Sequence, residues 1–149
     1  MNRELAQSPS FANKILFLKV CFWMGVVADL AATMPLLFPE IAKLMFGLRS
    51  IADGDEYSYV SRIGASLMSG WTFLLAWGSR KPVERKEILL LTAAPVLIGL
   101  LVSSVLAVQS GFIQMIYMLP LWIFYALFIP LCVIAYFIAA GIAKNHIAN

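Results

Sequence analysis

Asp29 is the residue whose type and position most clearly suggest chemistry, because it lies inside a long apolar stretch over residues 15–38. A carboxylate deep in a membrane span is costly and normally faces protein or water. Asp29 lies nine residues from the end of the stretch at Phe38, which corresponds to a depth of about 13 Å in a helix. That depth is close to the middle of a hydrocarbon core about 30 Å thick. The sequence therefore predicts a buried acidic group.

The helical neighbours of Asp29 are small. Gly25 lies one turn before it, and Ala32 and Thr33 lie one turn after it on the same face. Small side chains let another helix approach closely within a membrane. We therefore expect the carboxylate to point into a helix bundle and not into lipid.

Arg62 is the basic residue best placed to meet Asp29. It lies five residues inside a second apolar stretch over residues 57–78, at a depth of about 7 Å from the same side of the membrane. Its helical neighbours Ala65, Ser66 and Ser69 are small, so the two helices are expected to pack with Asp29 and Arg62 between them. The difference in depth of about 6 Å is within the reach of an arginine side chain.

Two interpretations of this predicted pair stay open. It is either a structural ion pair that fixes the register of two helices, or a polar site that binds a proton, an ion or a lipid headgroup. The candidate residues of the site are Asp29, Arg62, Thr33 and Ser66. An arginine beside the aspartate would hold the carboxylate in its charged form and would oppose proton cycling.

The sequence contains no pattern for a cofactor, a metal or a known catalytic reaction. Cys21 and Cys132 do not form a C-x-x-C pair, and they are predicted to be small buried apolar side chains. His146, the only histidine, lies near the C-terminus, which leaves no histidine-based metal or haem site. Motifs of hydrolases, nucleotide-binding proteins and metalloproteases are missing as well. The prediction is therefore no catalytic residue, no cofactor and no metal.

The apolar composition dictates the elements that position these residues. Of 149 residues, 62% are hydrophobic and 13% are charged, whereas about 25% are charged in soluble domains. Four apolar stretches, over residues 15–38, 57–78, 88–108 and 112–141, each reach the roughly 20 residues that a membrane-spanning helix needs. The predicted fold is all-α, an integral membrane four-helix bundle that forms a single membrane domain over residues 1–149.

A short amphipathic helix is predicted between the first two spans, after Pro39 ends the first helix. An apolar stripe follows at i, i+3, i+4 and i+7, formed by Ile41, Leu44, Met45 and Leu48. A helix over about residues 40–49 is therefore expected to lie in the membrane interface. The acidic segment over residues 53–56 is expected to be a solvated turn, since it lacks the spacing of a calcium-binding loop.

Prolines interrupt the last two predicted spans. Pro95 lies in the third span, and Pro120 and Pro130 lie in the fourth. Each is predicted to kink its helix or to free backbone carbonyl groups that neighbouring helices must satisfy.

Basic residues are unevenly distributed about the predicted spans. Eight of the eleven lysines and arginines fall on the side that holds both termini: Arg3, Lys14, Lys19, Arg80, Lys81, Arg85, Lys86 and Lys144. Because short cytoplasmic loops collect basic residues, both termini are expected to be cytoplasmic in a multi-pass protein of the cell membrane. Basic residues at membrane boundaries are typical of contact with membrane lipids, and they do not predict nucleic-acid binding here.

Several sequence blocks resemble a group of small bacterial and archaeal membrane proteins. The blocks are Asp29 with Leu37-Phe38-Pro39, Phe46-Gly47-Leu48, Arg62 with Gly64-Ala65-Ser66-Leu67-Met68 and Gly70-Trp71, Lys81-Pro82-Val83-Glu84-Arg85-Lys86, and Thr92 to Pro95. The order of elements is also similar in layout to the DoxX-like membrane proteins. The resemblance implies a polytopic four-helix membrane protein, and it carries over no catalytic residue.

These features favour a non-enzymatic membrane protein, either an accessory subunit of a larger membrane complex or a binder of a lipid-like apolar molecule within the bundle. The alternative is a small proton- or cation-coupled transporter with Asp29 as its protonatable site. It would be similar in size to the small multidrug resistance pumps, but the glutamate in their first span has no counterpart here. An isomerase similar to the emopamil-binding proteins would need several embedded acid–base groups. The small-residue pairs Ala65 with Ser69 and Ser66 with Gly70 offer contacts either for self-association or within the bundle.

Overall fold

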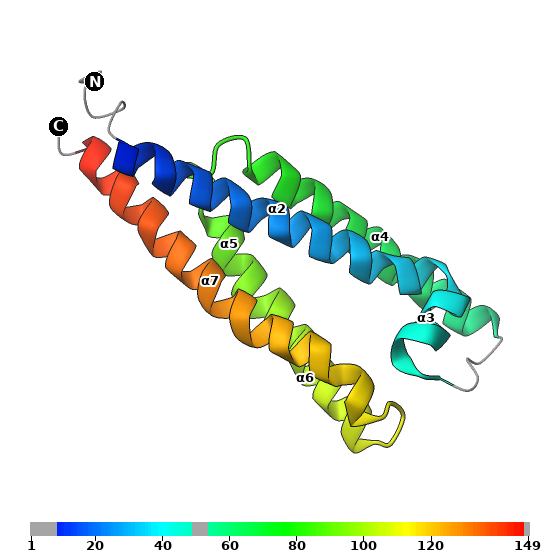
Figure 1. Ribbon diagram of the computed structural model, residues 1–149. Coiled ribbons are helices and arrows are strands. Elements are labelled where there is room, and N and C mark those ends of the chain that lie inside the picture. The colour runs from blue at the N-terminus through cyan, green and yellow to red at the C-terminus, as the bar shows by residue number, and fades with distance from the viewer. Residues whose placement is uncertain (1–8, 49–53, 148–149) are drawn as a thin grey trace.

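The computed structural model describes residues 9–48 and 54–147 of the chain. These residues form helices and short connections, and they contain no strand (Figure 1). The elements in chain order are α2 (Pro9–Leu37), α3 (Pro39–Phe46), α4 (Asp55–Gly78), α5 (Glu87–Leu91), the π-helical turn η1 (Thr92–Leu97), α6 (Ile98–Gln109) and α7 (Met115–Ile147). The all-α prediction is confirmed.

The predicted apolar stretches are helical, and the differences lie at their ends. α2 begins at Pro9 and not at residue 15, because proline is well tolerated in the first turn of a helix. α7 begins at Met115 and not at residue 112. The backbone N–H groups of Phe112 and Ile113 donate instead to the carbonyl of Ala107 and close the end of α6.

The acidic segment over residues 53–56 differs from its prediction. Asp55 and Glu56 form the first turn of α4, and Gly54 is its N-cap. Carboxylates are stabilised at this end of a helix, because the unpaired backbone N–H groups give it a partial positive charge. Asp55 and Glu56 are exposed, as predicted, but they are helical, so the predicted turn is wrong for these two residues. Asp53 lies outside the described residues.

The short helix after α2 is present as α3, with Pro39 at its first position. It ends before the predicted residue 49, because Gly47 adopts a left-handed φ of 62° and donates its N–H to the carbonyl of Lys43. Ala42 is buried, whereas Leu44 of the predicted apolar stripe is 82% exposed. The position of α3 in a membrane interface stays a prediction.

Three helical segments are long and apolar enough to cross a membrane: Phe11–Leu37, Glu87–Gln109 and Met115–Lys144. α4 is not among them, because Arg62 and several serine, threonine and glycine residues dilute its apolar residues. Many large apolar side chains are exposed, for example Val27, Leu67 and Leu127. Such an outer surface is unfavourable in water and suits lipid, so the fold is that of a membrane protein.

The long helices form two antiparallel pairs. α2 lies beside α4, and the rod formed by α5, η1 and α6 lies beside α7 (Figure 1). The two pairs are close at the end where α2 begins and α7 ends, and they diverge toward the opposite end. α3 lies at that opposite end, and its C-cap Gly47 meets the ring of Tyr117 at the start of α7.

The buried core lies where α2, α4, α5 and α7 are close. Its fully buried side chains include Leu18 and Phe22 from α2, Leu75 from α4 and Leu89 from α5. Cys21 and Cys132 also belong to this core, both with 0% exposure and both free. Their predicted role as small buried side chains is confirmed.

The prolines have different effects in the two later rods. Pro95 lies within η1, where the helix widens locally from the α form to the π form. A proline lacks an N–H group and removes one helical hydrogen bond, which agrees with the predicted irregularity. Pro120 and Pro130 lie inside α7, which runs on as one helix from Met115 to Ile147.

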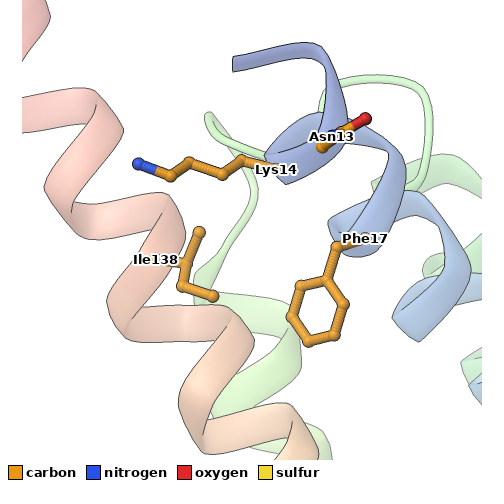
Figure 2. A pocket seen from close by; sticks show the side chains of 4 residues that line it. All are labelled: Asn13, Lys14, Phe17 and Ile138. Carbon is orange, nitrogen blue, oxygen red and sulfur yellow. The ribbon is translucent and has the colours of Figure 1, made fainter. Parts of the chain in front are cut away.

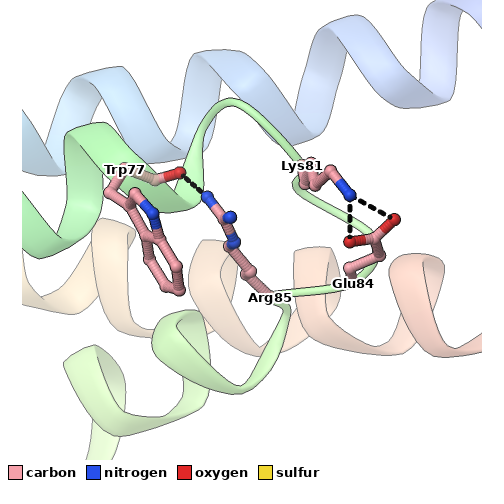
Figure 3. Close-up of polar contacts among 4 residues, drawn as sticks. All are labelled: Trp77, Lys81, Glu84 and Arg85. Atoms are coloured by element: carbon pink, nitrogen blue, oxygen red, sulfur yellow. Dashed lines mark hydrogen bonds and ion pairs between the residues drawn. The ribbon is translucent and has the colours of Figure 1, made fainter.

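Arg85 holds the connection between α4 and α5 in place (Figure 3). Its guanidinium donates to the backbone carbonyl of Trp77 and stacks over the Trp77 ring, 3.3 Å from the centroid. The same connection contains an ion pair between Lys81 Nζ and Glu84 Oε2 at 2.8 Å. A cation near the last carbonyl groups of a helix also interacts favourably with the helix dipole, so Arg85 stabilises the end of α4.

Candidate functional site

Asp29 lies deep in α2. It is eight residues from the end of the apolar segment at Leu37, which corresponds to about 12 Å along the helix. Its residue surface is 6% exposed. The carboxylate oxygen Oδ2 is buried and has no hydrogen-bond partner among the described residues. The predicted burial of Asp29 is confirmed.

The small face around Asp29 receives two other helices, as the sequence predicts. A Cβ atom placed on Gly25 would lie 3.1 Å from Leu75 of α4 and 3.6 Å from Phe128 of α7. Both helices therefore approach α2 closely one turn from Asp29. Tyr125 of α7 is 5% exposed and belongs to the same buried core as Val26 of α2 and Leu75 of α4.

The threonine hydroxyl groups on this part of α2 and α4 donate hydrogen bonds to backbone carbonyls. Thr33, which is buried, donates its hydroxyl to the backbone carbonyl of Asp29 at 2.7 Å. Thr72 of α4 is also buried and donates to the carbonyl of Met68 at 2.9 Å. Each hydroxyl thus gives its proton to a helix carbonyl and not to the Asp29 carboxylate.

Arg62 does not pair with Asp29, and the sequence prediction is wrong on this point. The Ser61 hydroxyl donates to the carbonyl of Leu36, which places this part of α4 beside a residue seven positions beyond Asp29. Seven residues correspond to about 10 Å along α2. The Arg62 side chain is also exposed, and it is in no ion pair within residues 9–48 and 54–147.

Ser66 lies apart from the site as well, because it is exposed on α4. The residues that face α2 are instead Ser61, Ala65 and Thr72, all buried. Of the four predicted site residues, the structure therefore brings together Asp29 and Thr33, and it leaves Arg62 and Ser66 on the outer surface of α4. The burial of Tyr125 in the core was also missed, because its continuous apolar run gives no register between α2 and α7.

Other buried polar groups in the described helices are paired. The Trp71 indole donates to the Thr92 hydroxyl at 3.2 Å, and Thr92 donates to the carbonyl of Ile88 at 2.8 Å. The Trp122 indole donates to the Ser104 hydroxyl at 2.8 Å. Pairing of this kind is the rule for buried polar groups, which makes the unpartnered oxygen of Asp29 an exception.

The geometry around Asp29 limits the chemistry that the site can perform. A single carboxylate among apolar and hydroxyl side chains can take up a proton, attract a cation or accept a hydrogen bond. No group of three histidine, cysteine, aspartate or glutamate side chains forms a metal site among the described residues, and the side chain of His146 lies outside them.

In comparisons with protein-family models, curated proteins and solved structures, the chain has no match.

Proposed function

We propose that the protein is a four-helix integral membrane protein without catalytic activity, whose helices bind a lipid-like molecule through the carboxylate of Asp29. The observation that carries this proposal is the buried and unpartnered oxygen Oδ2 of Asp29. A buried carboxylate is stable only with a proton, a cation or a hydrogen-bond donor beside it. The ligand class is therefore an apolar molecule with an ammonium or other donor group.

The properties of α4 support its role as a fourth span. Its 24 residues correspond to a length of about 36 Å, more than a hydrocarbon core needs. It also carries large exposed apolar side chains along most of its length: Val60, Ile63, Leu67, Phe73 and Trp77. These side chains face away from α2, where lipid would cover them. The similarity in layout to the DoxX-like proteins also stays a prediction.

The distribution of charge supports an orientation with both termini in the cytoplasm. The start of α2 and the end of α7 lie at one end of the molecule, and the connection between α4 and α5 lies in the same half, set back along α2 (Figure 1). This half carries Lys14, Lys144 and the basic residues of the connection. Cytoplasmic loops collect lysine and arginine, so we place this end on the cytoplasmic side of the cell membrane.

Native mass spectrometry of the protein extracted gently from its own membrane tests the binding proposal. We expect the wild-type protein to retain an apolar molecule that carries an ammonium or other donor group. The Asp29→Asn variant should lose this molecule, because the amide does not attract a cation. Asp55→Asn is the matched control, since it makes the same change at an exposed position in the first turn of α4. Retention of the same molecule by both variants would contradict the proposal, and a mass that includes another polypeptide would indicate an accessory subunit.

A proton- or cation-coupled transporter is the second candidate function, and the position of Arg62 favours it. An arginine beside Asp29 would oppose proton exchange, but Arg62 lies about 10 Å further along the helix pair. We expect proteoliposomes with an imposed pH gradient to accumulate the lipophilic cation tetraphenylphosphonium, and Asp29→Asn to abolish this uptake. Equal uptake by wild-type protein, Asp29→Asn and empty liposomes would exclude transport of this cation.

A further inference from the structure

A cavity of about 480 Å³, open to the surface as a groove and not enclosed, lies between the start of α2 and the end of α7. It is lined by Asn13, Lys14 and Phe17 from α2 and by Ile138 from α7. Figure 2 shows the Lys14 side chain extending from α2 toward α7, with Phe17 and Ile138 turned into the space between the two helices. The cavity therefore combines a cation with two apolar walls.

The depth of the cavity places this cation near a membrane surface. Lys14 lies three residues inside the apolar segment that begins at Phe11, which corresponds to about 4 Å along the helix. Phe17 lies about one turn deeper. A lysine at such a position reaches the headgroup level with its ammonium group while its stem lies along apolar surface. The ammonium group lies near the membrane surface, and the apolar side chains lie deeper in the membrane. This arrangement matches a phosphate group joined to acyl chains.

Charge complementarity points to an anionic occupant. The half of the molecule that contains the cavity has seven basic side chains in the described residues, against the two acidic side chains Glu84 and Glu87. The basic residues are Lys14, Lys19, Arg80, Lys81, Arg85, Lys86 and Lys144. Glu84 pairs with Lys81, and Glu87 pairs with Lys86. Lys14 is in no ion pair within residues 9–48 and 54–147, so its charge is available to a ligand.

We infer that this cavity is a binding site for an anionic phospholipid. Lys14 contacts the lipid phosphate, and an acyl chain lies against Phe17 and Ile138. Anionic lipids of the cytoplasmic leaflet attract basic residues at the ends of membrane helices, which agrees with the excess of cations in this half of the molecule.

The lipid site is separate from the site at Asp29. Lys14 and Asp29 are fifteen residues apart on α2, which corresponds to about 22 Å. A carboxylate repels a phosphate, so the two sites select ligands of opposite charge. Phospholipid binding at Lys14 is therefore independent of the proposed function, and substitutions at Asp29 should leave this binding unchanged.

Titration of the purified full-length protein with lipid, followed by native mass spectrometry, tests this inference. We expect phosphatidylglycerol to bind more tightly than phosphatidylcholine with the same acyl chains. Removing one basic contact with an anionic lipid corresponds to a loss of about fivefold in affinity. Lys14→Gln should therefore weaken phosphatidylglycerol binding about fivefold, whereas Lys14→Arg, which keeps the charge, should retain it.

Two further variants control for net charge and for the apolar walls. Lys19→Gln makes the same charge change on the same helix outside the cavity lining, and we expect it to leave the preference for phosphatidylglycerol intact. Phe17→Ala should weaken the binding of both lipids, because it removes part of the acyl-chain contact. Equal binding of the two lipids by the wild-type protein, an equal loss in Lys19→Gln and Lys14→Gln, or displacement of the lipid by inorganic phosphate would overturn the inference.

Discussion

Substitution of Gly78 by alanine is expected to lower the free energy of unfolding by about 2 kcal/mol, within the range for overpacked cores. Gly78 is buried where α4 ends against α2 and α5. A Cβ atom at this position would lie 2.5 Å from Cε1 of Phe22 and 3.1 Å from Cδ1 of Ile88. Phe22 is fully buried, so its ring can move only if the helices separate.

The matched control is Gly70→Ala, the same substitution two turns earlier on α4. Apart from the adjacent residues and backbone of α4 itself, no atom of the described residues lies within 4 Å of a Cβ placed on Gly70. Alanine in an exposed helix interior is more stable than glycine by about 0.5–1 kcal/mol, so Gly70→Ala should stabilise the protein. Unfolding in mixed detergent micelles, followed by far-UV circular dichroism, measures both effects. Effects of the same sign in the two variants would refute close packing at Gly78.

The close contact between α2 and α4 explains why the Asp29–Arg62 prediction fails. Gly78 against Phe22, Gly25 against Leu75, and Ser61 against Leu36 fix one register along the whole pair. This register brings Arg62 close to the end of α2 and not to Asp29. A weakened contact at Gly78 would also loosen the register that buries Asp29.

Much of the fold could be predicted from the sequence because the governing signals are local. Runs of apolar residues specify long helices, Pro39 separates α2 from α3, and glycine permits the left-handed turn that ends α3 at Gly47. The small residues Gly25 and Thr33 correctly indicate the face of α2 that is covered by other helices. These inferences need only neighbours along the chain.

The composition of the site could be predicted less well, because it depends on register and rotation between helices. Depth counting gives the axial position of Arg62 but not the direction of its side chain, which is exposed on α4. Tyr125 lies in a continuous apolar run with no local feature that predicts its burial in the core. The packing of whole helix faces decides both positions, and that packing involves residues far apart in the sequence.

The suitability of the α4 surface for lipid is also difficult to predict from the sequence. Its hydroxyl side chains suggest a polar helix, yet several of them donate to carbonyls one turn earlier, as Ser69 does to Ala65 at 2.8 Å and Thr72 does to Met68 at 2.9 Å. A hydroxyl satisfied by its own helix is far less costly in lipid than a free one. The polarity that a hydropathy average assigns to α4 therefore overstates what its surface presents.

Replacement of Asp29 by asparagine is expected to raise the free energy of unfolding of the ligand-free protein by about 1–2 kcal/mol. Insertion scales assign a cost of about 2.5–3.5 kcal/mol to a charged residue at the centre of a membrane helix. Asparagine removes the charge without changing the shape, but its amide is still polar, so only part of this cost is recovered. Thermal unfolding in detergent, before and after the bound molecule is removed, measures the change.

The sign of this change in stability distinguishes a structural ion pair at Asp29 from a polar binding site. A carboxylate held in a structural ion pair would be stabilising, and its loss would lower stability by several kcal/mol, about 3–5 for a buried pair. Asp55→Asn serves as the control, since the loss of a carboxylate from the first turn of α4 should lower stability by about 0.3–1 kcal/mol. A decrease in both variants would mean that Asp29 has a partner within the protein. An increase in Asp29→Asn alone would mean that this carboxylate has no stabilising partner within the protein.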